Sequence, residues 1–142
     1  MAEIRVSGSI AAPIDQVWRV AGSFGDIAAW VPPIQRSSLV DGSTGSEVGA
    51  KRQIDLDGGV TFVETQIARS DEKYTYSYSI PTGVLPMQNY EATVTLAKVA
   101  DGTEIEWSSS YDPDSGAEND VAGMIQGVYE SGIQALKERF GD

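Results

Sequence analysis

The feature that most constrains the fold is a series of segments in which apolar and polar residues alternate, joined by short turns. Five such segments follow one another along the chain: 50–56, 60–68, 74–80, 90–99 and 103–111. Strict alternation is typical of strands that bury one face. The first two segments flank Asp57-Gly58-Gly59, and the last two flank Ala100-Asp101-Gly102, which are strong hairpin signals. Strands joined by short hairpins predict an antiparallel sheet.

The N-terminal third of the chain combines strands with two short helices. Residues 3–10 alternate as a first strand, with Ile4, Val6 and Ile10 on one face. Residues 14–21 and 26–30 then follow helical spacing, separated by the glycine-containing segment 22–25. Two prolines end the second helix, because proline cannot continue the hydrogen-bond ladder. We expect a further strand over residues 35–40.

The chain ends in one long helix. An apolar stripe over residues 121–140 predicts it, with Lys137 and Arg139 favourably placed in its last turn. We find no repeat, linker or low-complexity tract. The order of elements therefore predicts a single α+β domain over residues 1–142, with a sheet of seven strands.

The charge and the missing residue types exclude several classes of function. Ten Lys and Arg against 21 Asp and Glu give a net charge of −11, which repels nucleic-acid phosphates and anionic membrane surfaces. The sequence contains neither Cys nor His, so thiolate nucleophiles, imidazole bases and the usual zinc or iron ligands are missing. We expect no nucleic-acid partner, no metal and no cofactor. Any catalysis falls to Asp, Glu, Lys, Arg, Tyr or Ser.

Other segments support the same exclusions. No apolar run approaches the length that a membrane span needs, and the N-terminal residues lead directly into the first strand. We therefore expect a soluble, cytoplasmic protein, whose oligomeric state the sequence leaves open.

Residues 42–49 lack the pattern of a phosphate-binding loop. Glu118-Asn119-Asp120 is typical of the first turn of a helix, not of a metal site.

Several short motifs occur in order along the chain. They are Ala12-Pro13-Ile14-Asp15-Gln16-Val17-Trp18, Trp30-Val31-Pro32, Val48-Gly49-Ala50-Lys51-Arg52, Val63-Glu64, Asn89-Tyr90 and Gly127-Val128-Tyr129-Glu130. In these motifs the chain resembles the START/Bet v 1-like (SRPBCC) superfamily, in its bacterial polyketide cyclase/dehydrase-like branch. The resemblance implies a helix-grip fold, in which a curved antiparallel sheet holds the long helix around an apolar cavity. It does not imply one activity, since related proteins bind lipids, cyclise or dehydrate polyketides, or act as carriers.

The central hairpin carries the strongest candidate site. If its loop is the three residues 57–59, Ile54 pairs with Phe62 and Arg52 pairs with Glu64, all on the buried face. Glu64 would then act as a general acid or base, and Arg52 would stabilise a developing oxyanion. The alternative is a structural ion pair, because a buried charge needs a partner. A loop that is one residue longer or shorter would no longer place Arg52 directly opposite Glu64.

The family resemblance bears on the same two residues. Plant proteins of a related branch, which make a sulfur-containing lachrymatory compound, use an Arg and a Glu on these two strands, and Arg52 and Glu64 are the matching positions. One position departs from the family. The Trp-x-Pro motif often has His in its middle, where this chain has Val31, so any role of that His is absent.

Further residues are candidates for lining the cavity. Tyr74, Tyr76 and Tyr78 share the parity of the buried face, and tyrosines on an inward face combine an apolar wall with hydroxyls that position a polar ligand atom. The other candidate ligand contacts are Trp30, Ile54, Phe62, Met87, Asn89, Trp107, Ile125 and Tyr129. For each of them packing, or for Asn89 a turn, is the competing interpretation.

Three functions remain open on these observations. The first is an enzyme that cyclises, dehydrates or isomerises a polyketide-like carbonyl compound by proton transfer at Glu64, assisted by Arg52. The second is a non-catalytic protein that binds or carries a small hydrophobic molecule. The third is a protein whose cavity no longer has a ligand. The substrate and the direction of any reaction do not follow from the sequence.

Overall fold

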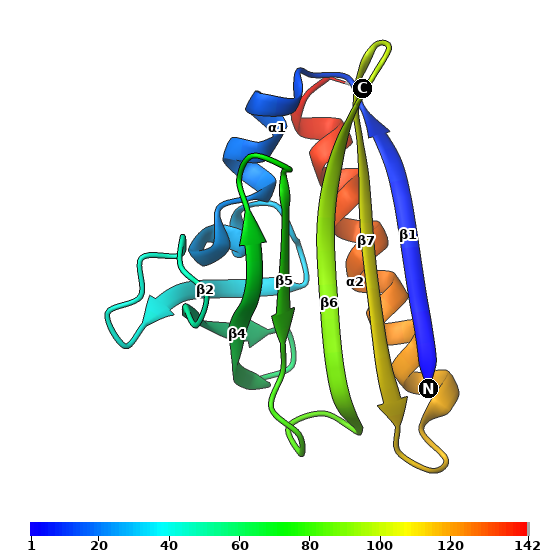
Figure 1. Cartoon of the computed structure of the whole chain (residues 1–142). Coiled ribbons are helices and arrows are strands. Elements are labelled where there is room, and N and C mark those ends of the chain that lie inside the picture. Colours follow the sequence, from blue (N-terminus) through cyan, green and yellow to red (C-terminus); the bar gives the residue numbers. More distant parts are fainter. Residues whose placement is uncertain (142) are drawn as a thin grey trace.

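A computed structural model describes residues 1–141 and shows a curved, seven-stranded antiparallel sheet around one long helix (Figure 1). The strands are β1 (Ala2–Ile10), β2 (Ile34–Val40), β3 (Lys51–Leu56), β4 (Thr61–Ser70), β5 (Thr75–Ser79), β6 (Met87–Val99) and β7 (Gly102–Pro113). The helices are α1 (Ile14–Ala21), the 3-10 helix η1 (Phe24–Ala29) and α2 (Glu118–Arg139). The spatial order is β1-β7-β6-β5-β4-β3-β2. This confirms the predicted α+β helix-grip fold.

Helix α2 packs on the inner face of the sheet, against β1 and β7 (Figure 1). Its buried residues recur at three- and four-residue intervals, as an amphipathic helix requires; they are Val121, Ile125, Tyr129, Gly132, Ile133 and Leu136. At Gly132 a Cβ atom would lie 3.1 Å from ring atoms of both Trp30 and Trp107. The absence of a side chain at Gly132 therefore lets the helix pack closely on these two indoles, which a larger residue would have to displace slightly.

Of the register irregularities in the sheet, which include one in β2 between Ile34 and Arg36, two set which side chains face inward. One lies in β6 between Gln88 and Glu91, where Asn89 has a φ of 57°. An irregularity of this kind lets the strand turn a side chain to the other face. Met87 and Tyr90, three residues apart, are consequently both buried. The other bulge lies in β4 between Gln66 and Ala68, and beyond it Arg69 lies beside the buried Tyr76, with its Cζ 5.9 Å from the ring centre.

The expected elements differ from the observed ones mainly at their ends. The predicted strand 74–80 begins at Thr75, because Tyr74 has a φ of 56° and leaves the extended conformation. The second short helix begins earlier than expected, at Phe24, and has 3-10 geometry. No helix within residues 1–141 has the length and apolarity needed to cross a membrane.

Candidate functional site

A cavity lies between the inner face of the sheet and α2. It is lined by Ile27, Ile34, Ile54, Leu56, Phe62, Glu64, Tyr78, Ile80, Leu85, Met87, Tyr90, Trp107, Met124, Ile125, Val128 and Tyr129. Its volume is about 50 Å³, well below the roughly 300–1,000 Å³ of typical small-molecule sites. Side chains must therefore move before a ligand of ordinary size can enter.

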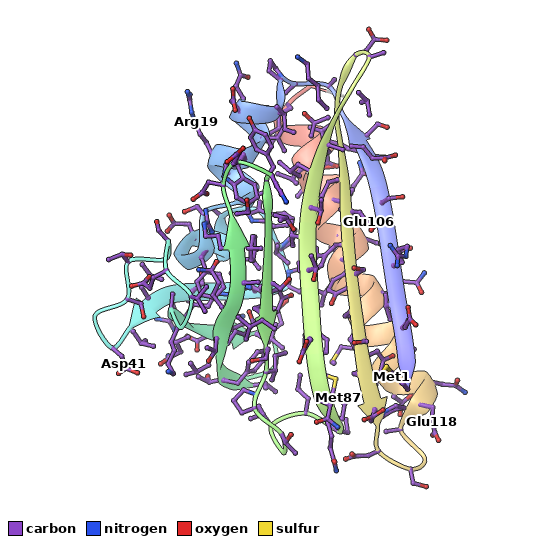
Figure 2. The ribbon with its side chains drawn as sticks, viewed as in Figure 1. Met1, Arg19, Asp41, Met87, Glu106 and Glu118 are labelled. Atoms are coloured by element: carbon purple, nitrogen blue, oxygen red, sulfur yellow. The ribbon has the colours of Figure 1, made fainter. Side chains whose placement is uncertain are left out.

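The mouth of the cavity is apolar. The lining side chains that are partly or largely exposed are Leu56, Ile80, Leu85, Met124 and Val128. They come from the ends of β3 and β5, the loop before β6 and the N-terminal half of α2. Figure 2 shows Met87, which is buried beside this mouth, at the same end of the molecule as Glu118. The mouth therefore opens at the end where α2 begins.

The hairpin of β3 and β4 has the register that the sequence predicts. Arg52 pairs with Glu64 and Ile54 with Phe62, and all four side chains are buried. The backbone N–H of Leu56 donates to the carbonyl of Val60 at 2.8 Å, which closes the three-residue loop. This short loop fixes the register, and the register brings the guanidinium and the carboxylate together.

Arg52 and Glu64 form a buried ion pair with one shared oxygen. Arg52 is 0% exposed and Glu64 is 5% exposed. The Arg52 Nε–H donates to Glu64 Oε1 at 2.7 Å. Nη2 lies 2.7 Å from the same oxygen without the alignment of a hydrogen bond, and Nη1–H donates to the carbonyl of Phe24 at 2.9 Å. Glu64 Oε2 receives no hydrogen bond from the residues described.

Aromatic rings surround the Arg52 guanidinium. Its Cζ lies 4.1 Å from the ring centre of Phe24, 4.6 Å from that of Tyr78 and 5.7 Å from that of Tyr76. Cations are stabilised over aromatic faces at these distances. Arg52 does not itself line the cavity, whereas Glu64 does. The side chain of Arg52 thus holds the carboxylate from within the protein.

The two charged groups change each other's proton affinity. Burial raises the pKa of the Glu64 carboxyl, and the nearby Arg52 guanidinium offsets only part of this increase. Burial alone would lower the pKa of Arg52, but the charge of Glu64 and the hydroxyls of Tyr76 and Tyr78 raise it above its ordinary value. Arg52 therefore remains a cation, while Glu64 binds a proton more readily than an exposed glutamate.

Hydroxyl groups form a second polar cluster in the cavity wall. The hydroxyls of Tyr90 on β6 and Tyr129 on α2 are hydrogen-bonded to each other. The indole Nε1–H of Trp107 donates to the Tyr78 hydroxyl at 3.1 Å, and the Trp107 ring stacks on Tyr129 with centroids 4.2 Å apart. Burial is the largest cause of a raised pKa in Tyr78, Tyr90 and Tyr129, and the charge of Glu64 adds to it. These phenols therefore stay neutral.

Most of the residues expected at the site lie together. The cavity lining includes Glu64, Ile54, Phe62, Tyr78, Met87, Trp107, Ile125 and Tyr129. Arg52 and Tyr76 lie behind the lining, where they contact each other. Trp30 packs on Trp107 with ring centres 5.2 Å apart, and it does not line the cavity either.

Two expected ligand contacts, Tyr74 and Asn89, do not line the cavity. The Tyr74 hydroxyl donates to Asp15 Oδ1 at 2.6 Å, and its ring meets the edge of Trp18. The Asn89 side chain is exposed and donates to Asp112 Oδ2 at 2.9 Å. Both residues have positive φ. Tyr74 packs beside Trp18 just before β5, and Asn89 lies on the outer side of β6 next to the buried Tyr90.

Several residues of the lining are not among those expected from the sequence. Tyr90 is the most consequential, because its hydroxyl is one of the few polar groups there. The motif Asn89-Tyr90 lies at this point of the chain, and Tyr90 alternates with the buried Ala92, Val94 and Leu96, which was a usable signal. The bulge instead brings Met87 to the inner face beside Tyr90. Ile27, Ile34, Leu56, Ile80, Leu85, Met124 and Val128 complete the group. Of these, Leu56 lies on the apolar face of the hairpin, which was a usable signal.

A curved sheet that closes around a helix over an apolar cavity defines a fold for binding hydrophobic ligands. The family model for polyketide cyclase / dehydrase and lipid transport matches residues 1–141, so the chain belongs to this family. The match confirms the resemblance to the START/Bet v 1-like (SRPBCC) superfamily. A search of curated proteins found no match to the sequence.

Solved structures agree with this assignment. The protein XoxI from Bacillus cereus is 28% identical, with a TM-score of 0.89 over 100% of this chain and 97% of that chain. A protein from Thermobifida fusca is 27% identical, with a TM-score of 0.88 over 99% and 94% of the two chains. The di-domain ARO/CYC protein BexL, from the BE-7585A biosynthetic pathway, is 17% identical, with a TM-score of 0.78 over 97% of this chain and 46% of its own. At that identity BexL shares only the fold.

Proposed function

We propose that this chain binds a small hydrophobic or aromatic, polyketide-like molecule in its cavity and catalyses a proton transfer on it. The observation that carries the proposal is a carboxylate on a cavity wall whose other polar groups are neutral. Glu64 is buried, and its Oε2 has no hydrogen bond from the described residues. A carboxylate with a raised pKa at such a position is suited to general acid–base chemistry.

Dehydration of a β-hydroxy carbonyl compound illustrates the reaction class. The Glu64 carboxylate removes a proton from the carbon between the two oxygen-bearing carbons. The resulting carboxylic acid returns that proton to the hydroxyl group, which leaves as water, and a carbon–carbon double bond forms. Cyclisation and isomerisation use the same transfer with a different acceptor. Glu64 begins and ends each cycle as a carboxylate.

Arg52 has a positioning role in this proposal. Its Nε and Nη1 hydrogens are used by Glu64 and by the Phe24 carbonyl, and it is not part of the cavity lining. It therefore acts on the ligand through Glu64: it fixes the orientation of the carboxylate and moderates the pKa increase that burial causes. Nearby phenols supply neutral donors for a ligand oxygen.

The placement of Arg52 also favours a second candidate, a binding or carrier protein without catalysis. If the guanidinium never contacts the ligand, the ion pair would have no catalytic role. Glu64 would then only accept a hydrogen bond from the polar end of the bound molecule. Both candidates require the cavity to accept a hydrophobic molecule. They differ in whether that molecule leaves chemically changed.

The first experiment asks whether the cavity is occupied. Native mass spectrometry and solvent extraction of the purified protein would be combined with a fluorescence titration using N-phenyl-1-naphthylamine. We expect the dye to bind wild type, and to bind Val128→Trp much more weakly, because Val128 lies at the half-exposed mouth. Equal binding by both proteins would place the dye elsewhere and contradict the proposal.

The second experiment separates the enzyme from the carrier. Extracted compounds would be compared between wild type, Glu64→Gln and Arg52→Ala, with the exposed Glu130→Gln as a matched control. The enzyme proposal predicts an altered compound from wild type and Glu130→Gln, and the unaltered compound from Glu64→Gln. The same unaltered compound from all four proteins would establish the carrier.

A further inference from the structure

The chain segments that line the cavity carry charges of one sign. Every lining residue comes from segments 27–34, 54–64, 78–90 and 107–129, which contain no Lys or Arg. Their acidic residues are Asp55, Asp57, Glu64, Asp112, Asp114, Glu118 and Asp120. Figure 2 shows Glu118 near Met87 and Arg19 towards the opposite end of the molecule. Two positive charges from outside these segments pair with the acidic residues: the α-amino group of Met1 lies 3.7 Å from Asp112, and Arg36 Nε lies 3.7 Å from Asp55.

Inside the cavity the charged group on the wall is also acidic. Glu64 lines the cavity, whereas Arg52 contacts Glu64 from behind the wall. An anionic ligand would therefore meet a carboxylate without reaching the guanidinium. A cationic ligand would add a second positive charge to a pair that is already neutral, and an uncompensated buried charge is unfavourable.

The hydrogen-bonding groups on the wall define what a neutral ligand must offer. Glu64 Oε2 is an acceptor without a donor among the described residues. The hydroxyls of Tyr90 and Tyr129 share one hydrogen bond, which leaves one O–H of the pair free to donate. A group that donates to the carboxylate and accepts from a phenol satisfies both, and a hydroxyl group does so with one atom.

We propose that the cavity selects an uncharged apolar ligand that carries a hydroxyl group, and that it rejects carboxylates and other anions. This inference rests on the proposed function, because it assumes that a ligand occupies the cavity. The ligand hydroxyl donates to Glu64 Oε2 and accepts from Tyr90 or Tyr129. The acidic segments around the mouth lower the local concentration of anions before they reach the cavity.

Three probes with one ring system test this selectivity. They are 2-naphthol, 2-methylnaphthalene and 2-naphthoate, each used at neutral pH to displace N-phenyl-1-naphthylamine. We expect 2-naphthol to bind about tenfold more tightly than 2-methylnaphthalene, as one hydrogen bond to a charged group implies. We expect 2-naphthoate not to compete. Glu64→Gln should reduce the preference for naphthol about threefold or more, and Glu130→Gln should leave it unchanged.

The outcomes distinguish this inference from the proposed function. If the dye binds but 2-naphthoate competes as well as 2-naphthol, the charge selectivity is wrong and the cavity function stands. Equal binding of naphthol and methylnaphthalene likewise overturns the role of the hydroxyl. If neither the dye nor any probe binds, the proposed function fails and the inference with it. Should Glu64→Gln not fold, the double variant Tyr90→Phe/Tyr129→Phe offers the same comparison, because it removes both hydroxyls that could donate to the ligand and should also reduce the preference.

Discussion

Removing Arg52 alone should destabilise the protein strongly. Arg52→Met keeps a long apolar side chain against Phe24 and Tyr78, but it removes the cation 2.7 Å from Glu64 Oε1. A carboxylate that is 5% exposed is then left without its partner. Breaking a buried pair in this way costs about 3–5 kcal/mol. At about 3 °C per kcal/mol for a chain of this size, the Tm should fall by about 10–15 °C at neutral pH.

Removing both charges should have a much smaller effect. In Arg52→Met/Glu64→Leu no charge remains buried, and apolar replacement of a buried ion pair is often neutral or stabilising by about 1–4 kcal/mol. The assay is thermal and urea unfolding followed by circular dichroism. The single variant should also recover stability at acidic pH, because protonation neutralises its Glu64.

Two results would refute this reasoning. An Arg52→Met protein as stable as wild type at neutral pH would show that Glu64 does not need its cation. A double variant as unstable as the single one would show that packing around the guanidinium, and not charge compensation, is what matters. A stable double variant that no longer binds ligand would mean that the pair is kept for function.

Three further predictions concern the helix, the carboxylate and the phenols. Gly132→Ala should destabilise the protein by about 1–3 kcal/mol in urea unfolding, because the new Cβ would press on Trp107. Gly127→Ala has open space around it and should stabilise the protein by up to about 1 kcal/mol. If Gly132→Ala were the more stable variant, the packing described would be wrong. Burial raises the folded-state pKa of Glu64 above 4.5, so protonation of this carboxyl stabilises the folded state. The difference in unfolding free energy between wild type and Glu64→Gln (wild type minus variant) should therefore fall as the pH rises above 4.5. A difference that grows with pH would show that the effect of Arg52 on this pKa outweighs that of burial. Tyr90→Phe removes the hydrogen bond to α2 and should cost about 1 kcal/mol in the same assay, so an unchanged unfolding free energy would count against that bond.

The fold could be predicted because its signals are local. Alternation shows which face of each strand is buried, and a three-residue loop between β3 and β4 determines which residues pair. These two facts are enough to place Arg52 opposite Glu64. No information about distant parts of the chain is needed. The bulge in β6 has no comparable signal. It brings Met87 to the inner face together with Tyr90, although alternation along the strand would place residues 87 and 90 on opposite faces.

The site was predicted less completely. Alternation along a strand shows which face of the sheet a side chain is on, but not whether that side chain reaches the cavity. Tyr74, Tyr76 and Tyr78 share one parity, yet only Tyr78 reaches the cavity. Tyr76 lies one pair further along the strand, beside Arg52, and Tyr74 lies beyond the end of β5. How far the cavity extends along each strand depends on where α2 crosses the sheet. That is a tertiary property which no strand encodes by itself.

The difference in depth between Arg52 and Glu64 changes what the pair can do. From the sequence the two residues are equivalent, since both face inward on neighbouring strands. In the structure one is enclosed by Phe24, Tyr76 and Tyr78, and the other reaches the cavity. A guanidinium on the cavity wall would have made the site a receptor for anions. Behind the wall it orients the carboxyl group and offsets part of the pKa increase that burial causes, so the ligand meets an acid–base group and no free cation.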